Sequence, residues 1–233
     1  MAVSLYALAS RLYPHSSAAA TLKGGLDAAE PIIAKLGGKV VGKEFTKGDE
    51  TDFAPLIARI AATKAKVLLF ALKGDGLDFI RQADDRGLLK DTTVEFLGLS
   101  EVDLGVFKGK GQNMFAVVPS VATSDDPAFK AFVAKVHSDA GGNATVSNYV
   151  MTHYNALVAL KAAIEKAGKV DKEAIVDSMA GLAIKSPTGP VTIGSDHHAT
   201  MSMFLARTQG RDLVPVRALG EITPEPGCKM DAR

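Results

Sequence analysis

His197 and His198, with Asp196 before them, are the cluster of side chains that most resembles a set of metal ligands. Neighbouring residues of a strand point to opposite faces, and no Cys, His or Glu follows this pair at a usual ligand spacing. Solvated loop histidines explain the pair better than a metal centre does. We therefore predict no metal site.

Groups for catalysis or for cofactor binding are equally sparse. Cys228 is the one cysteine, it has Lys229 as its only basic neighbour, and no serine lies in a G-x-S-x-G turn. The glycine-rich stretch Lys73-Gly-Asp-Gly76 matches neither G-x-G-x-x-G nor G-x-x-x-x-G-K-[ST]. The sequence therefore predicts that the protein is not an enzyme and binds no cofactor.

Polar side chains do follow several apolar runs that are typical of strands. The run from Val67 to Leu72 is apolar throughout, as in a strand buried on both faces of a parallel sheet. Ligands of such sheets bind beyond the carboxyl ends of the strands. The loops at these ends hold Tyr13, His15 and Ser16 after the run 3–9, Lys73 after the run 67–72, and Ser100 and Glu101 after the run 94–98.

Helical patterns alternate with these runs in the first half of the chain. A helix is expected from Ser16 or Ser17 to about Leu36, and Pro31 either breaks it or begins a second helix. Asp52 is a candidate cap for the next helix. Strands that alternate with helices at this spacing predict right-handed βαβ units and an α/β fold with a doubly wound parallel sheet.

The second half is richer in helix patterns. The segment 119–126 is expected to be a linker, and helices are predicted over 127–139, 148–167 and 172–182. Strands are predicted over 191–193, 203–206 and 214–218. This part is a helix-rich region that is incomplete by itself.

The helix predicted over 148–167 carries an apolar stripe. Its members recur at three- and four-residue spacing: Val150, Tyr154, Leu157, Leu160 and Ile164. Such a stripe has to be buried against another surface. We expect a homodimer or a domain-swapped pair through this face.

Composition narrows the classes of partner. The chain has 233 residues, of which 47% are hydrophobic and 23% charged, as in ordinary globular proteins. Its 27 Lys and Arg nearly balance its 26 Asp and Glu, so no net field attracts nucleic acid. The apolar start of the chain has no basic residue before it, and we expect no signal peptide.

Several segments, in order, resemble type I periplasmic binding proteins of the branched-chain amino acid and amide class. The segments that carry the resemblance are 13–17, 38–45, 52–60, 67–72, 79–83, 154–168 and 187–191. In that family two α/β lobes, joined by three crossovers, close over a small ligand. The resemblance covers essentially the whole chain.

The resemblance implies that the chain lacks the N-terminal part of lobe one. Residues 1–123 resemble lobe two, 124–207 a later return segment of lobe one, and 208–233 a C-terminal strand and tail. The opening stretch of lobe one, which supplies most contacts to the ligand in relatives, has no counterpart here.

The resemblance also assigns ligand contacts to this chain. Tyr13 falls where relatives place an aromatic that covers the ligand, and Leu72 and Lys73 fall where a side chain lines the cleft. Ser100 and Glu101 fall where an acidic residue pairs with a ligand ammonium. Packing for Tyr13 and solvation for Glu101 and Lys73 are the alternatives.

The function implied is that of a substrate-binding component of an ABC importer, in the periplasm. The ligand would be an amino acid, an amide or a small carboxylate, and the other partner an ABC permease. One alternative is a cytoplasmic ligand-sensing module of the same fold, and another is a truncated chain that binds no ligand.

Overall fold

In the computed structural model, two compact units are formed, and the structure describes residues 3–11, 17–47, 50–71, 77–142 and 144–224. Unit 1 comprises Met1–Ala116 and Arg207–Asp212, and unit 2 comprises Val117–Ala206 and Leu213–Arg233. The chain therefore passes between the units at 116–117, 206–207 and 212–213. The assignment of 1–123, 124–207 and 208–233 to lobes of the resembled family stays a prediction.

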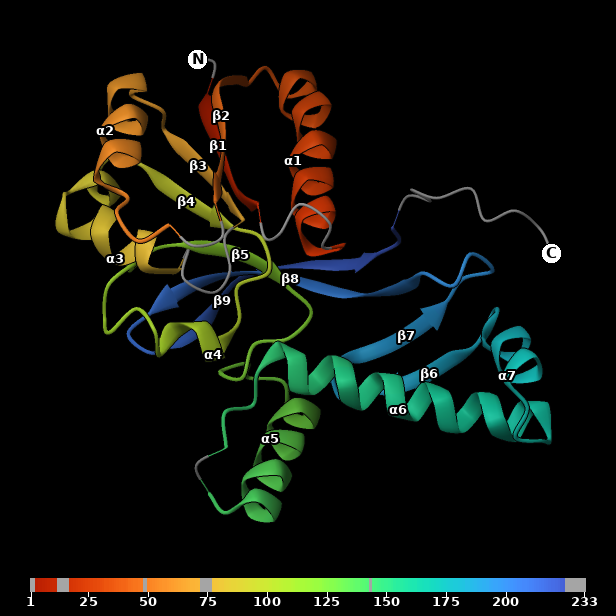
Figure 1. The fold of residues 1–233 in the computed structure, drawn as a ribbon. Coiled ribbons are helices and arrows are strands. Elements are labelled where there is room, and N and C mark those ends of the chain that lie inside the picture. Colours follow the sequence, from red (N-terminus) through yellow and green to blue (C-terminus); the bar gives the residue numbers. More distant parts are fainter. Residues whose placement is uncertain (1–2, 12–16, 48–49, 72–76, 143, 225–233) are drawn as a thin grey trace. The chain divides into compact units, whose positions relative to one another are not determined.

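Unit 1 is built from strands that alternate with helices (Figure 1). Its strands lie in the order β2-β1-β3-β4-β5, and the four pairings are parallel. In chain order the elements are β1 (Ser4–Arg11), α1 (Ser17–Lys35), β2 (Lys39–Lys47), α2 (Ala54–Thr63), β3 (Val67–Ala71), α3 (Asp78–Asp85), the 3-10 helix η2 (Leu88–Lys90), β4 (Thr93–Phe96), α4 (Glu101–Leu104) and β5 (Phe115–Val118). The predicted α/β fold with a mostly parallel sheet is confirmed.

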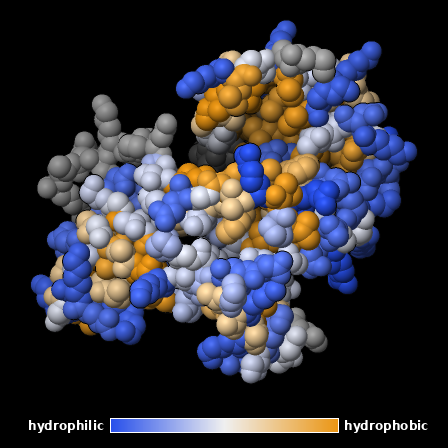
Figure 2. Space-filling model, turned by 180° about the vertical axis from the view of Figure 1, so that it is seen from behind, coloured by the Kyte–Doolittle hydropathy of each residue, from blue (hydrophilic) through white to orange (hydrophobic). Residues whose placement is uncertain are grey.

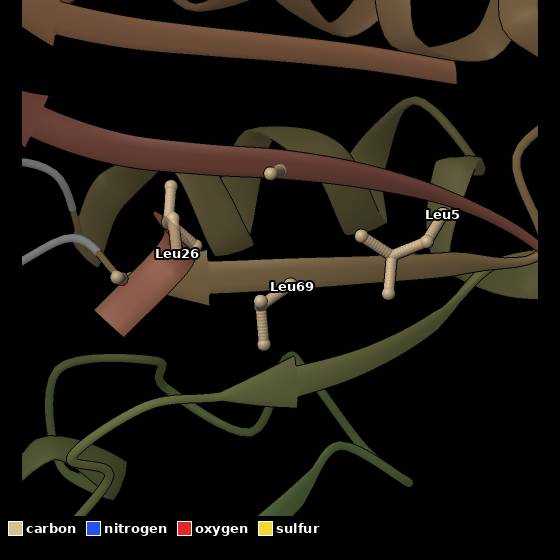
Figure 3. Close-up of a cluster of buried hydrophobic side chains, with 5 residues drawn as sticks. Leu5, Leu26 and Leu69 are labelled. Atoms are coloured by element: carbon tan, nitrogen blue, oxygen red, sulfur yellow. The ribbon is translucent and has the colours of Figure 1, made fainter. Parts of the chain in front are cut away.

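Side chains that alternate along the strands bury both faces of this sheet. On one face Leu5 of β1 and Leu69 of β3 pack with Leu26 of α1 (Figure 3). On the other face Phe70 stacks on Phe79 of α3, with ring centroids 5.4 Å apart, and meets Phe96 edge-on at 4.5 Å. Helices therefore cover both faces, as a doubly wound sheet requires.

Helix α1 continues through Pro31, so the expected break at this proline is not found. Leu26 and Ile33, on either side of Pro31, both pack against the sheet. Lys43 of β2 pairs with Asp27 and with Glu30, in the turn before the proline. Packing on both sides of Pro31 offsets the cost of about 3 kcal/mol that a proline imposes inside a helix.

Unit 2 combines helices with antiparallel strands (Figure 1). Its elements are α5 (Pro127–Ala140), α6 (Asn148–Ala167), α7 (Lys172–Met179), β6 (Ala183–Ser186), β7 (Gly189–Ile193), β8 (Ala199–Gln209) and β9 (Asp212–Ile222). β7 pairs antiparallel with both β6 and β8, and β9 pairs with β8. Ala159 of α6 packs in a core with Ile184 of β6 and Val191 of β7.

The helix predicted over 172–182 ends at Met179, and β6 begins shortly afterwards. The sequence did not indicate β6, because a strand of four residues with one buried side chain leaves too little alternation to detect. Leu182 packs into the core beside Ile184. The apolar residues at 182 and 184 thus belong to the approach to a strand and to the strand itself.

Large apolar side chains also remain at the surface of both units. Figure 2 shows apolar side chains gathered on the surface of unit 1, with hydrophilic ones around them. In unit 1, Ile32 is 59% exposed and Leu36 81%. In unit 2, Leu157 of α6 is 67% exposed. These residues lie outside the cores. A single exposed apolar side chain is common on protein surfaces, whereas several exposed apolar side chains on one face of a helix are not.

Candidate functional site

The candidate site lies at the carboxyl edge of the sheet in unit 1. β1, β3 and β4 are parallel, so their carboxyl ends meet at the same edge. Tyr13, His15, Ser16, Leu72 and Lys73 lie outside the described residues. The described part of the predicted site is therefore the segment after β4, which holds Ser100 and Glu101.

Ser100 is held rigidly at the start of α4. Its side chain is fully buried, its backbone is extended, and its N–H donates to Asp103 Oδ2 over 2.9 Å. The Asp103 N–H in turn donates to the Ser100 carbonyl over 3.0 Å. These two bonds fix the turn from β4 into α4, and with it the position of Glu101, the residue that follows Ser100.

Glu101 is the first residue of α4 and only 9% exposed. Solvation in a loop, the alternative expected for Glu101, is therefore not what the structure shows. A buried carboxylate is stable when charges or hydrogen bonds compensate for lost water. Glu101 is thus an acidic group held in a fixed place at this edge, and it has an interaction of its own within the chain.

Apolar side chains surround this acidic group along the chain. Leu99 and Phe107 are buried, Leu104 is 4% exposed, and Gly98 has a φ of 77°, which a residue with a side chain rarely adopts. Gly98 allows the tight turn that takes the chain from β4 toward α4. The segment therefore offers a largely apolar frame for two carboxylates, those of Glu101 and Asp103.

Asp103 is the residue at this edge that the sequence interpretation missed. Its carboxylate accepts a hydrogen bond from the Ser100 N–H, and this bond holds Ser100 and the adjacent Glu101 in position. The spacing Ser100-x-x-Asp103 is a capping-box pattern, and this signal was available in the sequence.

The polar side chains of the segment 97–104 are one hydroxyl and two carboxylates, those of Ser100, Glu101 and Asp103. This segment holds no histidine, cysteine or lysine beside its carboxylates. Among the described residues, no group of three His, Cys, Asp or Glu is placed to hold a metal ion. In the same part of the chain, no helix is long and apolar enough to cross a membrane.

A small cavity of about 200 Å³ lies within unit 2, at the predicted linker. It is lined by Ser120, Val121, Ser124, Asp126, Phe129, Thr188, Gly189, Phe204 and Pro215. The Asp126 carboxylate accepts the Phe129 N–H over 2.9 Å and so caps α5. The volume is below the roughly 300–1,000 Å³ of sites for drug-sized ligands.

The α/β fold described above is shared with a known protein family. A family model described as "Periplasmic binding protein" matches residues 10–212, and the chain therefore belongs to this family. The family and its solved relatives are binding proteins of transporters.

Solved structures of the same fold come from several bacteria. An ABC transporter substrate-binding protein from Sphaerobacter thermophilus is 15% identical with a TM-score of 0.81, and the match covers 94% of this chain and 61% of that one. A solute binding protein from R. palustris in complex with benzoate is 18% identical with a TM-score of 0.80, covering 98% and 62%. An amino acid ABC transporter substrate-binding protein from Pseudomonas fluorescens Pf-5 is 17% identical with a TM-score of 0.77, covering 97% and 61%.

These identities establish the shared fold alone. The chain spans about three fifths of the length of the solved structures that it matches, with 61%, 62% and 61% of them covered.

Proposed function

We propose that this chain provides the ligand-binding function of a solute-binding protein of an ABC importer. The observation that carries the proposal is the family match over residues 10–212, on a fold whose parallel sheet holds the Glu101 carboxylate at its carboxyl edge. Binding would be by closure of two lobes over the ligand, without catalysis. The ABC permease would be the second partner, and the periplasm the compartment.

The ligand proposed is an amino acid, an amide or a small carboxylate. Solved relatives are named for complexes with benzoate and 4-hydroxybenzoate, and one is named as an amino acid transporter protein. The contacts proposed from this chain are Tyr13, His15, Ser16, Leu72, Lys73, Ser100 and Glu101. Within this class Glu101 favours an amino acid, because its carboxylate attracts an ammonium and repels a second carboxylate.

Calorimetric titration with leucine and with benzoate tests the ligand proposal. If an amino acid binds through Glu101, Glu101→Gln should weaken leucine binding by roughly tenfold or more, the scale of a charge-assisted contact. The same change should leave benzoate binding unchanged or strengthen it. Asp177→Asn, which alters an exposed carboxylate on α7, is the control and should change neither.

Two results would contradict the proposal. Equal weakening of both ligands in Glu101→Gln would show that Glu101 supports the fold rather than the ammonium. Absence of binding to amino acids, amides and aromatic acids alike would favour the alternative in which the chain binds no ligand. A cytoplasmic location of the gene product, found by cell fractionation, would favour the ligand-sensing module.

We also propose that a second copy of the chain covers the exposed face of α6. Tyr154 is 40% exposed, Leu157 67% and Leu160 38%, and these residues lie at helical spacing on one face. The opposite face of α6 is buried in unit 2 through Met151 and Ala163. α6 is thus apolar on two faces. On the exposed face Tyr154 meets the ring of Phe132 of α5 edge-on at 4.9 Å, while Leu157 and Leu160 remain exposed.

A further inference from the structure

A groove of about 630 Å³ lies in unit 1, at the edge of the sheet opposite the candidate site. Its walls are α2, the loop 64–66 that leads into β3, and the segment 86–92 that leads into β4. These loops precede their strands, so the groove lies at the amino ends of β3 and β4. Its volume is in the range of roughly 300–1,000 Å³ that ligand sites occupy.

The floor of the groove is apolar and belongs to the core. Ile57 and Ile60 of α2, Ala65 and Leu88 line it, and each is at most 7% exposed. The side of α2 that lines the groove carries only small residues beside these, Ala54, Ala58 and Ala61. Residues at spacings of four and three lie on one helix face, and methyl groups there let a second backbone approach closely.

The rim of the groove is positively charged. Lys64, Lys66 and Arg86 line it, all three are exposed, and Asp91 is the one carboxylate among the lining residues. Three other cations of unit 1 do have acidic partners, since Arg59 pairs with Glu44, Arg81 with Asp78 and Lys110 with Asp85. Within the part of the chain that the structure describes, no ion pair is found for the three rim cations.

Backbone hydrogen bonds fix the positions of two of these cations, Lys64 and Lys66. Lys64 ends α2 in a left-handed conformation with a φ of 55°, and its N–H donates to the Ala61 carbonyl over 3.0 Å. The Lys66 N–H donates to the Ser4 carbonyl over 2.9 Å. Both side chains therefore start from rigid points beside the alanine face of α2.

We propose that this groove docks an amphipathic helix of a partner protein, with apolar side chains on the floor and acidic side chains facing Lys64, Lys66 and Arg86. An apolar floor beneath a rim of three cations and one carboxylate matches a helix of that composition. The row of alanines favours a helix over a small anion, because a small anion is bound through its charge and gains nothing from contact with methyl groups. The site is separate from the ligand edge, so this proposal does not depend on the proposed function.

Fluorescence anisotropy with a labelled helical peptide tests the proposal. The probe is a peptide of about 18 residues built from Leu, Ala and Glu, with one apolar and one acidic face. The variant Lys64→Glu, Lys66→Glu, Arg86→Glu should bind it at least about tenfold more weakly. The control Lys185→Glu, Arg211→Glu, Arg217→Glu changes the total charge equally at exposed cations outside the groove, and it should bind as the wild type does.

A change of shape separates docking from simple charge attraction. Ala58 is exposed on α2, so Ala58→Tyr should fold normally, which its melting temperature checks, yet fill the groove and weaken the peptide about tenfold. The proposal is overturned if the wild type does not bind the peptide, or if the control triple variant weakens binding as much as the rim variant. It is also overturned if tripolyphosphate displaces the peptide while Ala58→Tyr leaves peptide binding unchanged, because that result defines a small-anion site.

Discussion

The Tyr6 hydroxyl donates a hydrogen bond of 2.6 Å to Glu44 Oε1, which joins the buried β1 to the neighbouring strand β2. Arg59 of α2 donates to both oxygens of the same carboxylate, from Nε to Oε1 over 3.0 Å and from Nη2 to Oε2 over 2.7 Å. Tyr6 is only 3% exposed. One carboxylate therefore ties two strands and a helix together at this side of unit 1.

Tyr6 should make unit 1 sensitive to alkaline pH. Burial first, and then the hydrogen bond to Glu44, raise the pKa of the Tyr6 phenol well above its ordinary value. Above a pH of about 10 the phenol ionises in the unfolded chain but stays protonated in the folded one, so the free energy of unfolding falls as pH rises. Urea unfolding at about pH 8 and about pH 11, on either side of the ordinary tyrosine pKa, measures this effect. Tyr6→Phe should lose less stability than the wild type when the pH is raised between these values. Tyr154→Phe, at an exposed tyrosine, should follow the wild type, and an identical pH profile for Tyr6→Phe would contradict the prediction.

Glu44 should act at the opposite end of the pH range. The hydrogen bonds from Arg59 come first among the causes that lower the pKa of Glu44, and the bond from Tyr6 also contributes, against the opposing effect of burial. The stability this pair contributes is present above the ordinary glutamate pKa of about 4.3 and is lost as pH falls through the lowered value. Glu44→Gln should cost about 1 kcal/mol at neutral pH, because Arg59 is largely exposed, and the difference from wild type should shrink at a pH of about 3.

The exposed pair Lys161 and Glu165 on α6 provides the control for Glu44. Glu165→Gln should cost less than about 0.5 kcal/mol, as such i, i+4 pairs do. A difference between Glu44→Gln and the wild type that stays constant with pH would show that lost packing, rather than lost charge, is the cause.

Gly42 is required beside the Tyr6 ring. A Cβ placed on Gly42 would lie 2.2 Å from Tyr6 Cε2, far inside van der Waals contact. Gly42→Ala should therefore lower the free energy of unfolding by about 1–3 kcal/mol, the usual cost of overpacking. Gly24→Ala on α1 is the matched control, because nothing lies within 4 Å of its added Cβ, and it should stabilise by about 0.5–1 kcal/mol. Chemical denaturation of both variants measures the two effects. Equal stability of Gly42→Ala and the wild type would refute the predicted overpacking at Gly42.

The contrast between β3 and the Tyr6 contact shows what the sequence contains about the fold. The continuous apolar run at Val67 predicts β3, because burial on both sheet faces leaves a direct trace in residue types. The pairing of Tyr6 with Gly42 leaves no such trace, since the register of β1 and β2 shifts between Leu5 and Tyr6. Contacts across 38 residues, such as Tyr6 with Glu44, depend on that register.

The candidate site shows the same division. The alternation of strands and helices predicts the edge at which Ser100 and Glu101 lie, because parallel strands place their following loops at the same edge. The bond from Ser100 N–H to Asp103 is local and could have been found from the spacing of the two residues. The burial of Glu101 could not, because it depends on how α4 packs, which a four-residue segment does not encode.

The exposed face of α6 gives the last prediction, that the chain self-associates through Leu157. If a second copy covers this face, Leu157→Glu should convert a dimer into a monomer, because a buried and unpaired carboxylate at the interface costs several kcal/mol. The monomer itself should lose less than about 0.5 kcal/mol, since Leu157 is 67% exposed within the chain. Light scattering coupled to size exclusion at micromolar concentrations measures the mass. Leu36→Glu, at a leucine that is 81% exposed in unit 1, controls for the added charge and should remain dimeric. A monomeric mass for the wild type would contradict this prediction.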